Sequence, residues 1–525
     1  MRALLRSLAV AGLALVPAAA EAGRIYALVI GVDDYRFIPD LHGAVNDARD
    51  IAEALTALDA EVVTLLDGAA SRTAILSEWR RLATGLATDD QLIVSYAGHG
   101  SNEPEHFAGS EADGRDETLL LSGFAPYGAA AAERIRDDEI AELIALAGDG
   151  QTIFVADTCH SGTLSRNVAP ALGFRYVSVG RIEADPLPPP PPRAPAAEGR
   201  EVAALFLAAV DDSEKAPEFL IDGKPRGALS YAFAASLRGA ADADADRILT
   251  KGEIETYVRR KVRSISQGSQ RPQVAPAGES ERVVIALGST PAPAPEGGRP
   301  TDLGFDALPP VTLSHTGGPE GDRLLTPLGG VTLVAPATAA DLRVDLTTGT
   351  LLSMVGDVVR EIGAAPPATL RKEVQAAVDT LRLSAALTAM GDDLDVSFAG
   401  GDRTYRAGDV VTVRVTGRRS NGLSLLNIAS DGEIAFLYPR PDLGDPAEIA
   451  SDASLDLPLE VAAPFGADTV IAIETDGPAR DLREMLANLD GSRDVAGFWE
   501  GFRTLSRSLP TPPRIAVFPF HTVRG

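Results

Sequence analysis

Two residues of this sequence combine the types and the surroundings that nucleophilic catalysis requires. Cys159, the only cysteine among 525 residues, stands just after the apolar run 152–157. His99 stands just after the apolar run 91–97 and lies between two glycines. A cysteine attacks a carbonyl as the thiolate, and a nearby imidazole can take the thiol proton and later protonate the leaving amine. Together the two residues predict a cysteine nucleophile with a histidine general acid/base.

Both apolar runs are typical of buried strands in a parallel sheet, and reacting groups collect at the carboxyl edge of such a sheet. Two adjacent strands would bring Cys159 and His99 to that edge, and their separation of 60 residues allows one crossover connection. The glycines beside His99 let a substrate backbone approach closely. The backbone N–H groups of Gly100 and Cys159 are therefore the expected oxyanion donors.

Each residue also has a plainer interpretation. A lone cysteine is usually a small buried hydrophobe, and a histidine at a strand end is more often structural than catalytic. His160 is a competing base, but it is adjacent to Cys159 in an extended turn and is expected to point elsewhere. The presence of both residues at glycine-bordered strand ends favours catalysis over the plainer interpretation.

The chain is long enough for two or three domains, and it is strongly acidic. Its 74 Asp and Glu against 48 Lys and Arg give a formal charge of −26, and no Lys/Arg-rich run appears. A nucleic-acid binder needs a basic face, so we expect no nucleic acid as a partner. The acidic charge would attract basic substrates.

The N-terminal pattern predicts export. Arg2 and Arg6 precede the apolar stretch Ser7–Val16, and small residues follow up to Ala22, which is the pattern of a secretory signal over residues 1–22. The apolar stretch is too short to span a membrane, and no later segment is typical of a transmembrane helix. We expect a periplasmic or secreted protein with no transmembrane anchor after signal removal. A single thiol in an oxidising compartment is a liability unless it has a use.

Residues 23–287 alternate between apolar strands and amphipathic helices. Helical spacing of apolar residues is clearest in Ala44–Leu58, Ser71–Leu86 and Arg136–Ala147. A long polar loop is expected between His99 and position 116. The alternation predicts an α/β domain, a doubly wound and mostly parallel sheet with helices on both faces.

Three motifs of this domain resemble those of a known family. Tyr-Ala-Gly-His-Gly-Ser and Asp-Thr-Cys-His-Ser-Gly, after an opening Ala-Leu-Val-Ile-Gly-Val-Asp, are similar to the bacterial caspase-like cysteine peptidases of the metacaspase branch. The resemblance covers about residues 24–287 and implies a caspase-like fold, with His99 and Cys159 as the catalytic dyad of an endopeptidase that acts on protein or peptide substrates. It also implies that Asp47 and Asp157 line the pocket for the residue before the scissile bond. Two carboxylates there would accept Arg or Lys and repel Asp.

A Pro-rich loop over residues 183–200 is expected to be exposed and polyproline-like. It falls where caspase-like proteins carry the connection between their larger and smaller segments. We expect self-processing in this part of the chain, after Arg181, Arg193 or Arg200. A passive linker is the alternative.

No cofactor is expected for the chemistry itself. Metacaspase-like enzymes often need calcium bound to acidic loops, and the candidate ligands here are Asp113, Asp116, Asp137 and Asp138. Arg166 stands where a further acidic ligand would be expected, which argues against calcium activation and favours a solvated acidic loop. Residues 242–253 resemble an EF-hand loop, but Arg247 replaces the glycine of its sixth place and is expected to resist the turn.

The second half of the chain has a different pattern. A Pro/Gly-rich linker is expected over residues 288–300, followed by a β-rich and helical connecting region over 301–392. Over 393–525, strands with Asn-Gly and Asp-Gly turns predict a mainly β, sandwich-like domain with one helix at Ala479–Leu489. This part is similar to a β-rich domain of unknown function often appended to bacterial caspase-like peptidases. We expect it to bind a protein ligand or to give structural support.

The sequence therefore predicts an exported caspase-like cysteine endopeptidase that cleaves after Arg or Lys and processes itself. The alternative is a catalytically silent exported scaffold that binds partners through its C-terminal β-domain. A thiol hydrolase or transferase acting on non-peptide substrates is a third interpretation, because fold alone does not settle function.

Overall fold

The computed structural model describes the caspase-like half and the C-terminal half of the chain, with gaps. The described residues are 23–104, 115–148, 151–159, 174–179, 182, 185–188, 204–210, 216–266, 270–287, 300–336, 340–354, 356–390, 394–399, 404–446, 448–451 and 453–524.

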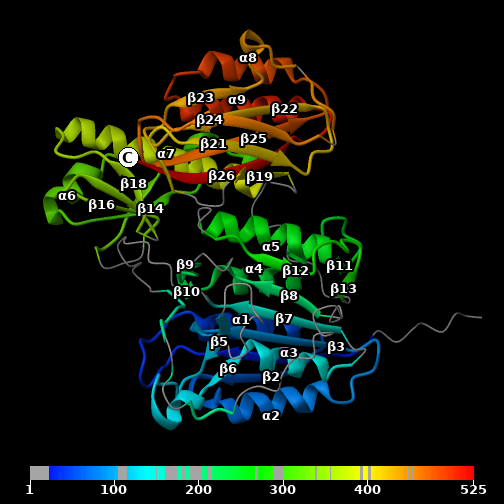
Figure 1. Cartoon of the computed structure of the whole chain (residues 1–525). Coiled ribbons are helices and arrows are strands. Elements are labelled where there is room, and N and C mark those ends of the chain that lie inside the picture. Colours follow the sequence, from blue (N-terminus) through cyan, green and yellow to red (C-terminus); the bar gives the residue numbers. More distant parts are fainter. Residues whose placement is uncertain are drawn as a thin grey trace, which may run out of the picture.

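A six-stranded sheet is the centre of the first half (Figure 1). Its strands lie in the order β12-β8-β7-β3-β1-β2, and all neighbours are parallel except β12, which runs antiparallel to β8. The strands are β1 (Ile25–Gly31), β2 (Glu61–Leu66), β3 (Gln91–Ala97), β7 (Gln151–Asp157), β8 (Ala204–Ala208) and β12 (Gln273–Ala275). Apolar residues fill most positions of the central strands, as expected where both faces of a sheet are covered.

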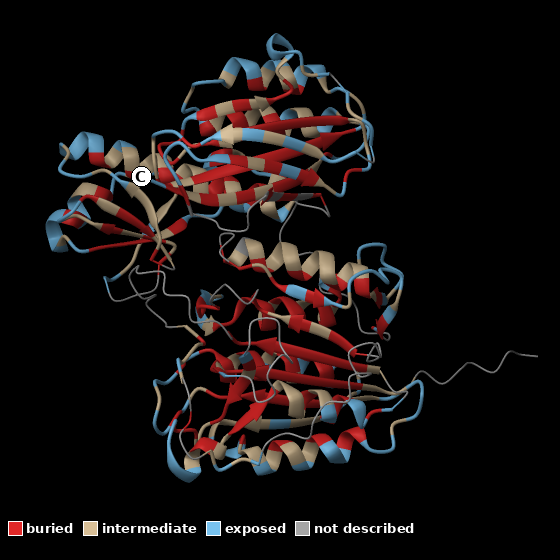
Figure 2. Cartoon of the chain, in the orientation of Figure 1, coloured by how far each residue is buried: buried red, intermediate tan, exposed pale blue. Residues whose placement is uncertain are grey.

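Helices cover both faces of this sheet. On one face lie α1 (Ala44–Thr56), α4 (Ala228–Ala235) and α5 (Lys251–Ile265), and on the other lie α2 (Arg72–Ala83) and α3 (Asp137–Ala145). Figure 2 shows the buried residues running through the central strands. The predicted mostly parallel sheet with helices on both faces is confirmed.

The segment after His99 differs from the prediction. Instead of a long polar loop, the described parts form an antiparallel sheet of β4 (Gly100–Pro104), β5 (Arg115–Leu120) and β6 (Arg134–Arg136). Several buried side chains of β4 and β5 are polar, namely Ser101, Glu103, Asp116 and Thr118. Buried Arg134 pairs with Glu103 at 3.0 Å. The usual alternation of apolar and polar residues is therefore missing from these strands.

Two short antiparallel pairs complete this half. They are β9 (Phe219–Ile221) with β10 (Lys224–Arg226), and β11 (Ile248–Thr250) with β13 (Val283–Ala286). The β9–β10 hairpin precedes α4, and it brings Glu218 to the site described below.

The connecting region is a mixed sheet with two helices. The sheet has the order β15-β14-β16-β17-β18, and helix α7 packs on it. The elements are β14 (Val311–His315), α6 (Gly318–Leu325), β15 (Val331–Leu333), β16 (Leu342–Asp345), β17 (Thr350–Ser353), β18 (Val358–Glu361) and α7 (Pro367–Ala389).

The C-terminal region is a β-sandwich with a helical layer. A sheet of β19-β21-β24 packs on a sheet of β20-β26-β25-β22-β23, and helices cover the outer face of the second sheet. The elements are β19 (Asp395–Ala399), β20 (Thr404–Arg406), β21 (Val410–Thr416), β22 (Gly422–Ile428), β23 (Ile434–Tyr438), β24 (Leu455–Glu460), β25 (Ala467–Thr475), α8 (Arg480–Leu489), α9 (Val495–Ser508) and β26 (Arg514–Val523). The predicted β-rich region is confirmed, but α9 was not predicted.

The two halves meet at α5, which lies between the central sheet and the C-terminal sandwich (Figure 1). Helix α7 contacts α5, and the guanidinium of Arg271 lies 5.0 Å from the ring centroid of Phe518. Within the described residues, no helix is both long enough and apolar enough to cross a lipid bilayer.

Gly31 is the last residue of β1, and it lies where the start of α1 packs on the sheet. A substitution at Gly31 therefore tests this packing. A β-carbon at position 31 would lie 2.6 Å from the carbonyl oxygen of Ala44. We expect Gly31→Ala to lower the free energy of unfolding by about 1–3 kcal/mol, the usual cost of overpacking. Urea denaturation measures the change, with Gly68→Ala as the control because no atom lies within 4 Å of a β-carbon there. Equal stability of the two variants would contradict the packing of α1 on β1.

Candidate active site

The register of β3 and β7 places the two candidate catalytic residues. Ala97 of β3 is paired with Asp157 of β7. His99 and Cys159 each follow the paired residue by two positions, so both leave the sheet at its carboxyl edge. Both residues are buried, with 2% and 0% of their surface exposed. The structure thus brings the two strand ends together at one edge.

Hydrogen bonds hold both the backbone and the ring of His99. Its N–H donates to the Tyr35 hydroxyl (2.7 Å), and the Tyr96 hydroxyl donates to its carbonyl oxygen (2.8 Å). Ring Nε2 lies 2.9 Å from the carbonyl oxygen of Pro39, which can only accept, so Nε2 carries the proton and Nδ1 is the acceptor. Nδ1 is buried and has no hydrogen-bond partner among the described residues. Burial lowers the pKa of His99 to about 4, so its imidazole is neutral at pH 7.

Cys159 lies among backbone groups from three segments. Its Sγ accepts a hydrogen bond from the N–H of Ala216. Its own N–H donates to the carbonyl oxygen of Arg175 (3.2 Å), and the N–H of Gly100 donates to the same oxygen (3.0 Å). A β-carbon on Gly100 would lie 2.3 Å from the carbonyl oxygen of Cys159, so the close approach requires glycine. The two predicted oxyanion donors therefore converge on one carbonyl oxygen beside the thiol.

The side chain of Arg175 fills a pocket made of three carboxylates. Its Nη2 pairs with Asp47 and lies 3.2 Å from Glu218. Its Nη1 lies 3.2 Å from Oδ1 of Asp157 and donates to the carbonyl oxygen of Asp157 at 3.0 Å. All four side chains are at most 1% exposed. The two aspartates expected to line a specificity pocket thus face the same guanidinium.

The start of α4 holds two of these carboxylates. Asp47 accepts from the N–H of Gly227 at 3.0 and 2.9 Å, and Asp157 accepts from the N–H of Ser230 at 2.8 Å. A β-carbon on Gly227 would lie 2.2 Å from Oδ2 of Asp157, so glycine is required there. The backbone N–H groups at a helix N-terminus lack partners within the helix and favour negative charge. The N-terminus of α4 therefore holds both carboxylates in the pocket.

The start of α1 holds the third carboxylate. Glu218 accepts from the N–H groups of His42 and Gly43, each at 2.8 Å. Asp33 lies next to it and caps the same helix, accepting from Ala44 at 2.8 Å. Burial raises the pKa of Asp33, and the charge of Glu218 raises it further.

Burial dominates the electrostatics of this pocket. It raises the pKa of Asp47 well above its usual value, and the guanidinium of Arg175 opposes this rise. Burial alone would lower the pKa of Arg175, but Asp157, Asp47 and Glu218 raise it well above its usual range. The guanidinium therefore stays charged, and it is the cation that these buried carboxylates require.

Two residues of this site, Glu218 and Arg175, were not predicted from the sequence. Glu218 directly precedes the short strand β9. It is far from Asp47 and Asp157 in the sequence, and no motif links the three residues. The sequence patterns instead pointed to arginines in and beside the Pro-rich loop as self-cleavage sites. Those residues and the competing base lie outside the described part of the chain: Arg181, Arg193, Arg200 and His160.

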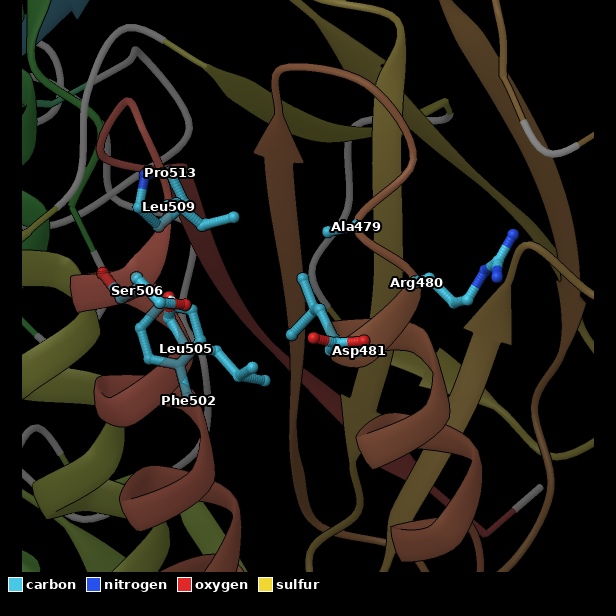
Figure 3. A pocket seen from close by; sticks show the side chains of 10 residues that line it. Ala479, Arg480, Asp481, Phe502, Leu505, Ser506, Leu509 and Pro513 are labelled. Carbon is cyan, nitrogen blue, oxygen red and sulfur yellow. Dashed lines mark hydrogen bonds between the residues drawn. The ribbon is translucent and has the colours of Figure 1, made fainter.

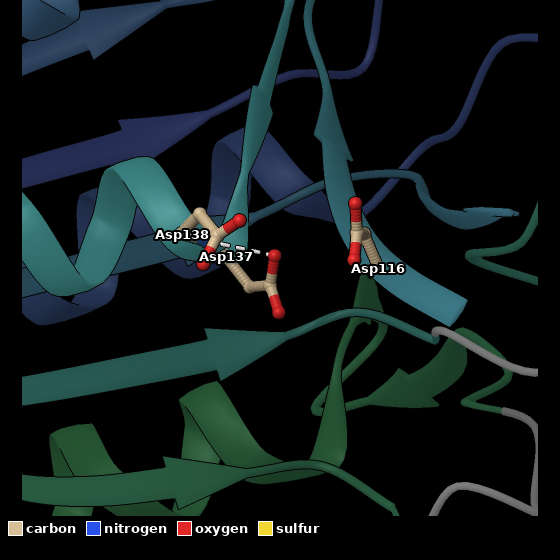
Figure 4. A group of neighbouring side chains, drawn as sticks. All are labelled: Asp116, Asp137 and Asp138. Carbon is tan, nitrogen blue, oxygen red and sulfur yellow. Dashed lines mark hydrogen bonds between the residues drawn. The ribbon is translucent and has the colours of Figure 1, made fainter. Parts of the chain in front are cut away.

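Three of the candidate calcium ligands lie together (Figure 4). Asp116 of β5 and Asp137 and Asp138 at the start of α3 place carboxylate oxygens within 4.8 Å of one another. Asp116 is buried and the other two are half-buried, whereas Asp113 lies outside the described residues. Ca²⁺ takes about six to eight oxygen ligands. Three carboxylates suit such an ion and leave places for carbonyl oxygens and water.

A second acidic group lies in the EF-hand-like loop. Asp242, Asp244 and Glu253 also place carboxylate oxygens within 4.8 Å of one another. Arg247 adopts a φ of 68°, so the expectation that it would resist the left-handed turn was wrong. Glu253 already accepts from the backbone N–H of Thr250 at 2.9 Å, which engages it at the start of α5.

The C-terminal region has a pocket of about 140 Å³ between α8 and α9 (Figure 3). Phe502, Leu505 and Leu509 form part of its wall, and Asp481 and Ser506 add polar groups. Its ten lining residues, all described, include no cysteine and no histidine. This pocket therefore lacks the two residue types that make up the candidate catalytic pair at the edge of the central sheet.

The half of the chain that carries the His99–Cys159 site matches a known family. The family model described as the caspase domain covers residues 24–281. This part of the chain is therefore similar to the caspase domain. Metacaspase-1 of Eremothecium gossypii is 31% identical to the chain over 173 residues, and Metacaspase-7 of Arabidopsis thaliana is 28% identical over 148 residues. Residues 24–281 are thus similar to the caspase domain and to parts of metacaspases.

These matches are partial in both directions. They cover 31% and 26% of this chain, and 36% and 35% of the two metacaspases, so the chain spans little more than a third of their length. Among solved structures, a protein from Geobacter sulfurreducens has a TM-score of 0.38 and 21% identity, covering 49% of this chain and 97% of that one. Caspase-1 from Spodoptera frugiperda has a TM-score of 0.33 and 12% identity, and the match covers 50% of this chain and 90% of that one.

The low pKa of His99 makes stability depend on pH in a definite direction. An unfolded histidine titrates at about 6.5, whereas His99 titrates at about 4 in the folded protein. Between these values the unfolded chain binds more protons, so the contribution of His99 is complete above about pH 6.5 and falls as the pH drops towards 4. We expect Cys159→Ala protein to lose stability more steeply over this range than the same protein carrying His99→Gln. Urea denaturation at several pH values measures this, and parallel curves would refute the buried neutral imidazole.

Proposed function

We propose that this protein is an exported cysteine endopeptidase that cleaves peptide bonds after arginine or lysine. The observation that carries the proposal is the pocket in which Asp47, Asp157 and Glu218 surround one guanidinium beside the thiol. A basic side chain bound there brings the carbonyl group of its own residue to the N–H groups of Gly100 and Cys159. The pocket and the nucleophile are therefore arranged for one kind of bond.

His99 and Cys159 are the proposed catalytic pair. Neutral His99, with its Nε2–H held by Pro39, takes the thiol proton at Nδ1. The thiolate attacks the substrate carbonyl, and the N–H groups of Gly100 and Cys159 stabilise the oxyanion. His99 then protonates the leaving amine, and water hydrolyses the thioester to regenerate the thiol.

Charge selects the side chain before the cleaved bond. An aspartate there would add a fourth carboxylate to a buried group of three, which like-charge repulsion disfavours. Arginine has an advantage over lysine, because the two Nη atoms reach Asp157 and Asp47 separately, whereas an ammonium group is a single point charge. We therefore expect arginine to be preferred to lysine.

The remaining parts of the proposal rest on sequence patterns. The N-terminal pattern supports a periplasmic or secreted location, although residues 1–22 lie outside the described part of the chain. The C-terminal β-sandwich is proposed to bind a protein ligand. No cofactor is proposed for the chemistry. The alternative is activation by calcium bound to Asp116, Asp137 and Asp138, which place carboxylate oxygens within 4.8 Å of one another.

Matched fluorogenic peptides ending in Arg, Lys or Asp, with calcium or with EDTA, test this proposal. We expect hydrolysis after Arg, slower hydrolysis after Lys and none after Asp, at equal rates in both buffers. Cys159→Ala and His99→Ala should abolish the activity. Asp47→Asn should lower kcat/KM for the Arg peptide by about a hundredfold, as expected when a buried ion pair loses one partner.

Glu53→Gln is the matched control for Asp47→Asn, because Glu53 is an exposed carboxylate on the same helix, with 80% of its side chain accessible. We expect it to leave the rate unchanged. Cleavage after Asp would refute the pocket assignment. Activity only with calcium would refute the cofactor-free proposal, and inactivity towards every peptide would favour the catalytically silent scaffold.

A further inference from the structure

Two buried tyrosine hydroxyls hold the backbone of His99. The N–H of His99 donates to the Tyr35 hydroxyl at 2.7 Å, and the Tyr96 hydroxyl donates to the carbonyl oxygen of His99 at 2.8 Å. The N–H of Leu120 donates to the same carbonyl oxygen at 2.9 Å. Both tyrosines are at most 5% exposed. The backbone N–H and carbonyl groups of His99 are therefore both engaged by neighbouring segments of the domain.

Gly98 makes room for these hydroxyls. A β-carbon at position 98 would lie 2.5 Å from the Tyr96 hydroxyl and 2.8 Å from the Tyr35 hydroxyl, closer than real β-carbons come to other atoms. A larger residue would thus push both tyrosines away from His99. The glycine before the histidine, which the sequence analysis linked only to the approach of a substrate, also serves the support of the histidine itself.

Tyr35 begins a short turn, residues 35–40, that contacts the imidazole of His99 at both of its ends. The ring centroids of Tyr35 and His99 lie 4.8 Å apart, and the carbonyl oxygen of Pro39 lies 2.9 Å from Nε2 of His99. Asp40 joins the two ends, because its Oδ1 accepts from the backbone N–H of Tyr35 at 2.9 Å. The turn is therefore closed by Asp40 while it lies against the imidazole.

The turn is also fastened to the rest of the domain. Just before it, the backbone N–H groups of Asp33 and Asp34 donate to Oδ1 of Asp67 at 2.9 and 3.0 Å. Within it, the N–H of Arg36 donates to the carbonyl oxygen of Ser122 at 3.0 Å. Side chains of a catalytic site keep their geometry when packing and hydrogen bonds of this kind lock the groups around them.

We propose that Tyr35 and Asp40 are positioning residues of the catalytic step, which hold the turn against His99 and so keep its Nδ1 available to the thiol of Cys159. This proposal rests on the proposed peptidase function. There, His99 takes the thiol proton at Nδ1 and returns it to the leaving amine, and an imidazole rotated out of place does neither. Both residues act through His99 and not on the substrate.

The electrostatics of the turn agree with this role. Burial and the charge of Arg175 lower the pKa of His99, whereas the hydrogen bond to Pro39 and the negative charge of Asp40 raise it. The turn therefore favours the imidazolium that forms when His99 takes the thiol proton. Burial raises the pKa of both tyrosines that hold the histidine backbone, so their hydroxyls stay neutral while His99 changes its charge.

Steady-state kinetics with the Arg-ending fluorogenic peptide test the proposal. Tyr35→Phe keeps the ring and removes the hydroxyl. We expect it to lower kcat by about tenfold and to leave KM within about twofold, because one buried hydrogen bond is lost and the substrate contacts remain. Asp40→Ala should lower kcat to a similar extent. Asp40→Asn should recover most of that loss, because an amide oxygen can still accept from the N–H of Tyr35.

Tyr438→Phe is the matched control for Tyr35→Phe. Tyr438 is also buried, and its hydroxyl donates to the carbonyl oxygen of Pro446 at 3.3 Å in the C-terminal sandwich. We expect this variant to leave kcat and KM unchanged. If Tyr35→Phe acted through a rise in KM with an unchanged kcat, the substitution would have altered substrate binding, and the positioning role would be refuted.

NMR of the full chain labelled with ¹⁵N-histidine separates this proposal from the proposed function, because it needs no turnover. The chain has six histidines, and His99→Gln identifies the signals of His99. Wild type should show one neutral tautomer, protonated at Nε2, and Tyr35→Phe and Asp40→Ala should each show both tautomers. Wild-type kcat and a single tautomer in these variants would refute the positioning role and leave the proposed function standing. If wild type hydrolysed no peptide, the proposed function would be refuted, and the tautomers would still decide whether Tyr35 and Asp40 position His99.

Discussion

The burial of three carboxylates around one point is the constraint on which the rest of the site depends. Removing an ionised carboxylate from water costs several kcal/mol, so Asp47, Asp157 and Glu218 need a cation and hydrogen-bond donors. Arg175 supplies the cation here, and the carboxylates still outnumber it. Backbone N–H groups at the starts of α1 and α4 offset the excess negative charge. We propose that a pocket built in this way selects a basic side chain, whether it belongs to the protein or to a substrate.

The doubly wound fold places this pocket beside Cys159, the proposed nucleophile. Strands β3 and β7 end side by side, so His99 and Cys159 leave the sheet at the same edge, each two residues after the Ala97–Asp157 pair. Helices α1 and α4 pack on one face of the sheet and point their first turns at this edge, where Gly227 allows the carboxylates to approach closely. The charged pocket and the neutral imidazole can coexist because burial disfavours protonation of His99.

Sequence reasoning could predict the parts of this site that are built from strong local patterns. Long apolar runs that end in Gly-His-Gly and Asp-Thr-Cys mark two strand ends, and the resemblance to metacaspases pointed to Asp47 and Asp157. Glu218 lies before a three-residue strand, which is too short to show a periodic pattern. Arg175 could not be recognised because its role depends on tertiary contacts with segments far away in the chain.

Two parts of the fold, the β4–β5 pair and helix α9, were missed for different reasons. In β4 and β5 four of the buried side chains are polar (Ser101, Glu103, Asp116 and Thr118), and Glu103 is paired with Arg134, so the alternation of hydrophobic and polar residues was absent. Helix α9, by contrast, has a clear signal, because Val495, Phe498, Trp499 and Phe502 recur at helical spacing and are all buried. The sequence analysis expected a mainly β domain with a single helix at Ala479–Leu489, and this expectation concealed the pattern of α9.

The most direct test of the central claim is covalent labelling of Cys159 by peptidyl chloromethyl ketones that differ in one side chain. A Phe-Arg probe and a Phe-Asp probe would each be incubated with the purified protein, and the labelled residue and its rate would be measured by mass spectrometry. The account predicts rapid labelling of Cys159 by the Arg probe, much slower labelling by the Asp probe, and loss of this difference in Asp47→Asn. Equal rates for the two probes would contradict a pocket that binds a basic side chain beside the thiol.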